Sequence, residues 1–202
     1  SCLKCVEEEY LMDLSTNDVS QMQNLNSLLS KRGKVYLLVY AAGMSAVNRF
    51  EEISQIQYST VLNVNLSSAF FLSQLCFKKM KEHNDGGNII FVSSQVALPG
   101  CAQEYNSLYA LTKCAINGLV RSLAKEGAPH IRVNAICPGD LDSKLARDGR
   151  ESFCMLMGLS EAQYDTFIEE RSAIKRRLVP SEIANAAIFL LQNTAMTGAL
   201  LN

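Results

Sequence analysis

Short apolar runs rich in β-branched residues alternate with longer segments of helical periodicity along this chain. Alternation of this kind predicts βαβ units, in which helices cover both faces of a parallel sheet. The runs are almost continuously apolar, as expected for strands that are buried on both faces. We therefore predict an α/β fold with strands at residues 9–12, 35–40, 88–92, 131–136 and 199–201.

Helices are predicted between these strands. The first carries an apolar stripe and ends at Gly33, because glycine commonly terminates helices. The second begins at Ser54, whose spacing to Gln57 is that of a capping box. The last is introduced by Pro180, a residue favoured in the first turn of a helix. The predicted helices span residues 19–32, 54–80, 106–126 and 182–191.

The segment from Pro138 to about Pro180 is predicted to be irregular apart from one short helix, which Ser160 and Gln163 begin with capping-box spacing. The segment is too apolar for a solvated loop, so we expect it to cover a pocket. Its large apolar residues are Phe153, Met155, Leu156, Met157, Tyr164 and Phe167.

Length and charge limit the number of domains and the kind of partner. A chain of 202 residues with 48% hydrophobic residues can bury one sizeable core, so residues 1–202 are expected to form a single domain. Nineteen basic and twenty acidic residues give a net charge of −1, which argues against a nucleic acid or an anionic membrane as partner. A small neutral ligand fits this balance better.

The N-terminus and the cysteines indicate the compartment. Glu7, Glu8 and Glu9 stand where a targeting sequence has basic residues, and we expect no apolar run long enough to span a bilayer. Seven cysteines in mostly apolar surroundings suit reduced thiols better than disulfides. A soluble, cytoplasmic protein is expected.

One CxxC pattern, Cys2 and Cys5, is compatible with a redox pair or with half of a zinc site. A structural zinc site needs four ligands. The sequence has no second CxxC, and its two histidines, His83 and His130, stand alone. We expect no metal site.

Tyr109 and Lys113 lie four residues apart in a predicted helix, so their side chains leave the same face about one turn apart. A cation at this distance favours tyrosinate and lowers the tyrosine pKa toward the value that a general acid/base needs. The spacing alone also fits an ordinary pair of surface residues.

Small and turn-forming residues follow three of the predicted strands. Ser93 and Ser94 follow the run NIIFV, Pro138 and Gly139 follow IRVNAIC, and Gly43 follows VYLLVYAA. Ligands bind beyond the carboxyl ends of the strands in open parallel sheets. We expect these residues to meet Tyr109 and Lys113 at one edge of the sheet.

The order of these motifs resembles that of the short-chain dehydrogenase/reductase family, over nearly the whole chain. The matching pieces are MDLS at 12–15, AAG at 41–43, NVNL around Asn65, the strand ending in Ser93-Ser94, YALTK at 109–113, RVNAICPG at 132–139 and MTGALLN at 196–202.

The resemblance implies catalytic roles for four residues. Tyr109 exchanges a proton with the substrate oxygen, and Lys113 lowers the Tyr109 pKa and holds the nicotinamide ribose. Ser94 hydrogen-bonds the substrate oxygen, and Asn65 anchors a water that links Lys113 to solvent. The same resemblance implies NAD or NADP as cofactor, bound by Asp13, Leu14, Ala41, Ala42, Gly43, Tyr109, Lys113, Pro138, Gly139, Leu141 and Ser143.

Two local features depart from the family pattern. Ala41 and Ala42 replace the amide side chains that commonly follow this strand in the family. Fifteen residues separate Ser94 from Tyr109, about two more than the family pattern has, so the loop between them must bulge for Ser94 to act. Ser93 is the alternative serine.

The largest departure is the absence of a glycine-rich turn before Asp13, the turn that cradles the pyrophosphate in Rossmann-type folds. We expect a Rossmann-like, doubly wound parallel sheet that lacks its first βαβ portion, with an exposed strand edge beside an apolar face. We interpret the sequence as a fragment of a longer reductase. The residue that separates NAD from NADP is missing with that portion.

The leading functional hypothesis is an oxidoreductase that transfers a hydride between NAD(P)(H) and a carbonyl or secondary alcohol, with an apolar substrate and a homo-oligomeric state, dimer or tetramer. Compatible substrates include 3-oxoacyl thioesters, steroids, ketones and sugars. The alternative is a catalytically silent relative that acts through subunit association by its two long helices. A sugar-nucleotide epimerase or dehydratase, which shares Tyr-x-x-x-Lys, is a third option.

Overall fold

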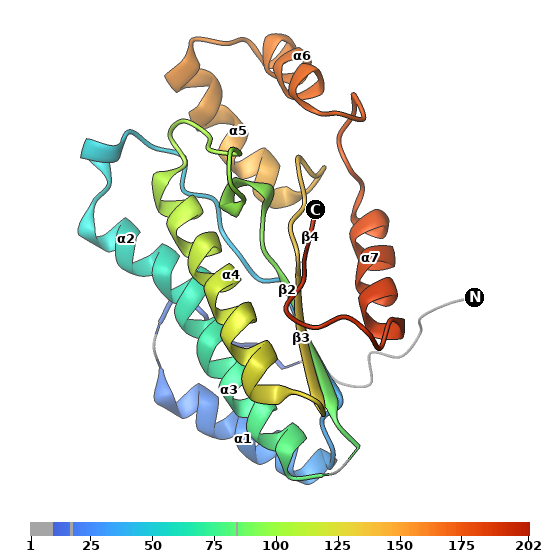
Figure 1. Ribbon diagram of the computed structural model, residues 1–202. Coiled ribbons are helices and arrows are strands. Elements are labelled where there is room, and N and C mark those ends of the chain that lie inside the picture. Colours follow the sequence, from blue (N-terminus) through green and yellow to red (C-terminus); the bar gives the residue numbers. More distant parts are fainter. Residues whose placement is uncertain (1–9, 17, 84) are drawn as a thin grey trace.

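A four-stranded parallel sheet forms the centre of the computed structural model, which describes residues 10–16, 18–83 and 85–202 (Figure 1). The strands lie in the order β1-β2-β3-β4 and all pairs are parallel. The predicted α/β class is confirmed. The acidic residues Glu7 to Glu9 and the CxxC of Cys2 and Cys5 lie outside the described residues. The strands are β1 (Leu37–Tyr40), β2 (Gly87–Val92), β3 (Ile131–Ile136) and β4 (Leu200–Leu201).

Helices cover both faces of the sheet because successive strand residues point to opposite sides. Phe91 of β2 packs in the core beneath α3 and α4, whereas its neighbour Ile90 packs against Leu190 of α7 on the other face. This double coverage is the predicted doubly wound arrangement (Figure 1). The helices that flank the sheet are α1 (Val19–Arg32), α3 (Ser68–Lys81), α4 (Ser107–Gly127) and α7 (Pro180–Gln192).

Strand β1 is an edge of the sheet. Leu37 and Val39 point to the same face of this strand and are 42% and 44% exposed. The expected apolar face beside an open strand edge is therefore confirmed among the described residues. The prediction of a strand at 9–12 is wrong for residues 10–12, which have no regular structure. A strand needs a hydrogen-bonded neighbour, and none lies alongside these residues in the described chain.

The helix predicted from Ser54 is one continuous helical run that changes its hydrogen-bonding pattern in the middle. Ser54 caps α2 (Gln55–Leu62) by accepting a bond from the Gln57 N–H at 3.1 Å. A π-helical turn, η2 (Asn63–Ser67), then joins α2 to α3. Such turns often mark functional sites, and this one places Asn65 in the interior.

The 27 residues Gln55–Lys81 are long and apolar enough to cross a membrane, which the sequence analysis did not expect. The packing of these residues gives another reason for their apolar composition, because several of them form part of the protein core. Val61, Ala69 and Met80 are buried against other parts of the chain, and Asn65 is fully buried among them. An amide at that position suits a core helix better than a lipid-facing one.

The segment after β3 is more regular than predicted. It contains α5 (Lys144–Met157), which the sequence analysis missed, and α6 (Glu161–Arg171), where the predicted capping box of Ser160 and Gln163 is confirmed. Both helices lie beyond the carboxyl ends of the strands (Figure 1). Two short 3₁₀ turns, η1 (Phe50–Glu52) and η3 (Gln95–Ala97), complete the described elements.

Arg132 of β3 fastens α7 to the sheet. Its guanidinium donates hydrogen bonds of 2.8 to 3.0 Å to the carbonyl oxygens of Leu190, Leu191, Asn193 and Met196. The last carbonyls of a helix have no partners within the helix and carry its negative dipole end. A cation at this point therefore satisfies several acceptors at once.

We predict that Arg132→Met lowers the free energy of unfolding by about 2–4 kcal/mol, because it leaves these carbonyls without a charged donor. Urea unfolding followed by circular dichroism measures the change. Arg132→Lys keeps the charge but has fewer donors, so its loss should be intermediate. Equal stability of Arg132→Met and the parent chain would refute the role of this contact.

Candidate active site

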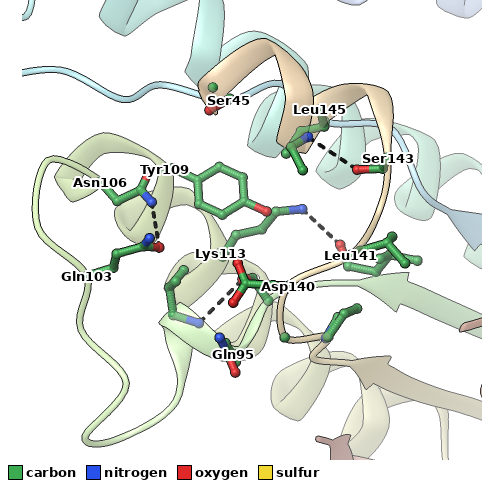
Figure 2. A pocket seen from close by; sticks show the side chains of 18 of the residues that line it. Ser45, Gln95, Gln103, Asn106, Tyr109, Lys113, Asp140, Leu141, Ser143 and Leu145 are labelled. Carbon is green, nitrogen blue, oxygen red and sulfur yellow. Dashed lines mark hydrogen bonds between the residues drawn. The ribbon is translucent and has the colours of Figure 1, made fainter. Parts of the chain in front are cut away.

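A cavity of about 280 Å³ opens at the carboxyl ends of β1, β2 and β3, below α5 and α6 (Figure 2). Side chains from the sheet, from α4 and from the segment after β3 meet there. The location is the one expected for ligands in a parallel sheet. The segment predicted to cover a pocket does so, through Leu145, Phe153 and Tyr164 among others.

Tyr109 and Lys113 enter this cavity from one face of α4, as their spacing predicts (Figure 2). Lys113 is only 4% exposed, and its Nζ donates a hydrogen bond of 2.9 Å to the carbonyl oxygen of Val92, the last residue of β2. The same nitrogen lies 5.5 Å from the centroid of the Tyr109 ring. A buried cation and a phenol therefore share one wall.

Burial sets the proton affinities of this pair. It lowers the pKa of Lys113 to about 8, because an ammonium loses its hydration inside the protein. It also raises the pKa of Tyr109, which contact with the Ser94 hydroxyl partly offsets. The net shift of the Tyr109 pKa is thus upward, opposite to the direction expected from Lys113, because desolvation is the largest influence. At neutral pH both groups carry a proton and can donate one.

The structure distinguishes the two serines after β2. Both line the cavity, but Ser94 lies beside Tyr109, whereas the Ser93 hydroxyl donates a hydrogen bond of 2.7 Å to Asn117 Oδ1 and lies 3.3 Å from the Lys113 carbonyl oxygen. Ser93 thus holds α4 against the sheet and lies 3% exposed. The extra length before Tyr109 is taken up by η3 and by a loop that includes a left-handed residue, Tyr105.

Asn65 lies behind the cavity rather than in its lining. Its amide accepts from the Met44 N–H at 2.8 Å and donates to the Met44 carbonyl and to Thr112 Oγ1. The loop after β1 is therefore tied to both η2 and α4. A Cβ placed on Gly43 would lie 3.6 Å from Lys113 Nζ and 3.7 Å from Asn65 Oδ1, so this loop packs directly against the buried amine.

The predicted cofactor contacts fall into two groups. Seven of them line the cavity with Tyr109 and Lys113, whereas Asp13 and Leu14 line a separate hollow between α1 and α3. The Asp13 carboxylate accepts hydrogen bonds from the backbone and hydroxyl of Ser15, which form a local turn. The seven that are brought together are Ala41, Ala42, Gly43, Pro138, Gly139, Leu141 and Ser143.

The cavity fits half of a nicotinamide dinucleotide. Small residues at 41–43 leave room along one wall, and the Lys113 ammonium uses one of its three donors on Val92. The volume lies near the lower limit of about 300 Å³ for ligand pockets, which suits a nicotinamide and its ribose. No glycine-rich turn for a pyrophosphate lies beside the cavity in the described part of the chain.

Several polar residues of the cavity were not predicted from the sequence, namely Gln95, Gln103, Asn106 and Asp140. Burial raises the pKa of the Asp140 carboxyl, and the charges of Arg177 and Arg171 oppose that shift. One signal was available, since Asp140 directly follows the Pro138-Gly139 turn. The three amide side chains lie in η3 and the loop that follows it, where no helical or strand periodicity predicts which way a side chain points.

Comparison with known proteins shows what the chain is similar to. The sequence profile described as enoyl-(acyl carrier protein) reductase matches residues 4–201. A 3α-hydroxysteroid dehydrogenase of Mediterraneibacter gnavus is 33% identical over 192 residues, which are 93% of this chain and 71% of that protein. An L-rhamnose 1-dehydrogenase of a Sphingomonas species is 29% identical over 191 residues, 91% of this chain and 71% of that protein.

A similar solved structure is a variant of actinorhodin polyketide ketoreductase with NADPH. It superposes with a TM-score of 0.85 at 26% sequence identity, over 94% of this chain and 73% of that one. The named substrates of these proteins range from a steroid to a sugar and a polyketide. Similarity of sequence therefore leaves the substrate open.

We predict that Lys113→Met stabilises the chain at pH 7 by about 1–4 kcal/mol, because it removes a buried charge. Below pH 8 the buried charge destabilises the folded chain by its full amount, because Lys113 is ionised in both the folded and the unfolded state. This destabilisation declines as the pH rises from about 8 toward the ordinary value of 10.5, where both states are neutral.

Unfolding experiments between pH 6 and pH 10 therefore test whether the difference between Lys113→Met and the parent shrinks at high pH. Lys125→Met, an exposed position on the same helix, is the matched control and should change little. A stability difference that stays constant over this range would contradict the burial of a titrating amine.

Proposed function

The chain belongs to the short-chain dehydrogenase/reductase family, and from this we propose that it interconverts a carbonyl and a secondary alcohol with NAD or NADP. The observation that carries the proposal is the shared cavity of Tyr109, Lys113 and Ser94 at the ends of the strands. Asn65 lies behind this cavity and fixes the loop after β1 through hydrogen bonds to the Met44 backbone.

In the proposed reaction Tyr109 and Ser94 bind the substrate oxygen. Charge that develops on this oxygen is neutralised by the proton on the Tyr109 hydroxyl. Lys113 stabilises the tyrosinate that remains, because its ammonium lies close to the ring. The raised pKa of Tyr109 keeps the phenol protonated at neutral pH, so it holds the proton that reduction of a carbonyl requires.

The proposed cofactor lies along Ala41 to Gly43 and along Pro138, Gly139, Leu141 and Ser143, with its ribose at Lys113. A bound nicotinamide supplies a hydride to the substrate carbon or accepts one from it. Ala41, Ala42 and Gly43 present little side-chain bulk to it.

Association of subunits and cellular location are proposed as well. Phe70 and Phe71 of α3 and Leu111 of α4 are 43%, 47% and 51% exposed, a group of apolar side chains on the two long helices. These helices suit a homo-oligomer, a dimer or tetramer. The cysteines in the described part of the chain are unpaired, which supports a cytoplasmic location.

Tyr109→Phe should lower kcat by about 10²–10⁴ because it removes the proton donor and leaves the ring in place. Steady-state kinetics with NADH and NADPH on a panel of carbonyl compounds measures the loss. Tyr58→Phe, which removes the same hydroxyl from an exposed position on α2, should behave like the parent. Activity of Tyr109→Phe near the parent level would contradict the proposal.

The nicotinamide half of the cofactor should account for most of the binding by this chain. We predict that reduced nicotinamide mononucleotide binds within about tenfold of NADH and that Lys113→Met weakens both, since Lys113 lies at the ribose. Saturation-transfer NMR detects weak binding. Adenosine monophosphate, the other half of the cofactor, is the matched control and should not compete with NADH. If it competes and the nicotinamide mononucleotide does not, the placement of the nicotinamide half in the cavity is refuted.

A further inference from the structure

Four polar side chains beside Tyr109 form what we call the polar wall: Gln95, Gln103, Asn106 and Asp140. They come from three segments, the turn η3, the loop before α4 and the turn after β3 (Figure 2). None is needed for the proton transfer described above. Their presence in the same cavity as Tyr109 requires a separate explanation.

The amides of the polar wall keep unused hydrogen-bonding capacity. Asn106 donates to Gln103 Oε1 at 2.9 Å, which leaves the Gln103 amino group and the Asn106 oxygen available. The Gln95 side chain has no hydrogen-bond partner among the described residues. Its amide lies against Gly139, where an added Cβ would be 3.1 Å from Gln95 Oε1. Glycine at this position lets the amide reach the cavity.

Asp140 adds an acceptor to this set. Its carboxylate lines the cavity and makes no hydrogen bond or ion pair within the described chain, because Arg177 is bonded instead to Asp165 at 2.8 Å. A carboxylate accepts hydrogen bonds from hydroxyl groups and repels anionic groups. It therefore favours a neutral substrate with several hydroxyls.

The aromatic residues of the covering helices do not make the cavity purely apolar. Phe153 of α5 packs against Tyr164 and Phe167 of α6, with ring centroids 5.6 and 5.7 Å apart, so these rings mainly hold the two helices together. Phe153 and Tyr164 still line part of the cavity. Aromatic surface in the lining suits the carbon face of a ring that carries hydroxyls on its rim.

We propose that the substrate is a neutral polyhydroxylated ring compound, a sugar or a cyclic polyol, whose hydroxyls bind the polar wall while Tyr109 binds the reacting oxygen. This inference rests on the proposed function and narrows its substrate class. It replaces the apolar substrate expected from the sequence, because the apolar residues of the covering segment are largely used in its own packing.

A matched pair of ligands isolates the contribution of the hydroxyls. Cyclohexanol and myo-inositol share a six-membered carbon ring and differ in the number of hydroxyl groups. We expect the parent chain to oxidise inositol or an aldohexose with NAD or NADP at least about 100-fold more efficiently than cyclohexanol in kcat/KM. Sites made to hydrogen-bond a hydroxyl reject analogues without it by large factors.

Asp140→Leu tests the polar wall, and Asp142→Asn is its control, since Asp142 is exposed and paired with Arg147 at 2.6 Å. Asp140→Leu should lower kcat/KM for the polyol at least tenfold and leave that for cyclohexanol within about twofold. Asp142→Asn should leave both unchanged. A parent chain that prefers cyclohexanol, or equal loss for both alcohols in Asp140→Leu, would overturn the inference.

Binding of myo-inositol and D-glucose to the chain without cofactor, observed by saturation-transfer NMR, provides a readout that does not require turnover. Signals that disappear in Asp140→Leu support the inference even if no substrate is turned over, and in that case only the proposed function fails. Absence of binding in the parent, or binding that Asp140→Leu leaves unchanged, would overturn the inference, and the kinetics of Tyr109→Phe then test the proposed function separately.

Discussion

One buried ammonium determines how the rest of the site is arranged. Lys113 is almost fully enclosed, and a cation in such surroundings is unfavourable unless fixed acceptors replace its lost water. The Val92 carbonyl serves as one acceptor because β2 ends there, directly below α4. The same packing holds Tyr109 one helical turn away at the mouth of the cavity, and Asn65 fixes the neighbouring loop.

The sequence predicted well those parts of the site that follow from regular geometry. Strand ends in a parallel sheet meet at one edge, and a four-residue spacing fixes one helix face, so Tyr109, Lys113 and the 138–139 turn were found. It could not choose between Ser93 and Ser94, which are adjacent and both line the cavity. Tertiary contacts distinguish them, because the Ser93 hydroxyl is bonded to Asn117 whereas Ser94 lies beside Tyr109.

Helix α5 was missed for a similar reason. Gly149 in its interior lowers helix propensity, and only the structure shows why glycine is there: a Cβ would lie 2.6 Å from the Ser45 hydroxyl. The polar wall was likewise hidden in loops without periodicity. Long-range packing, rather than local pattern, thus positions the cover of the cavity and the groups beside Tyr109, and both bear on what the cavity can bind.

Tyr109 and Lys113 can donate protons at neutral pH only if both remain protonated in their buried site. Carbon-13 NMR of the labelled Lys113 Cε and Tyr109 Cζ atoms, assigned with Lys113→Met and Tyr109→Phe, reports both titrations directly. We predict that Lys113 titrates with a pKa of about 8 and that Tyr109 remains a phenol at that pH. Titration of Lys113 near 10.5, or ionisation of Tyr109 below pH 8, would contradict this prediction.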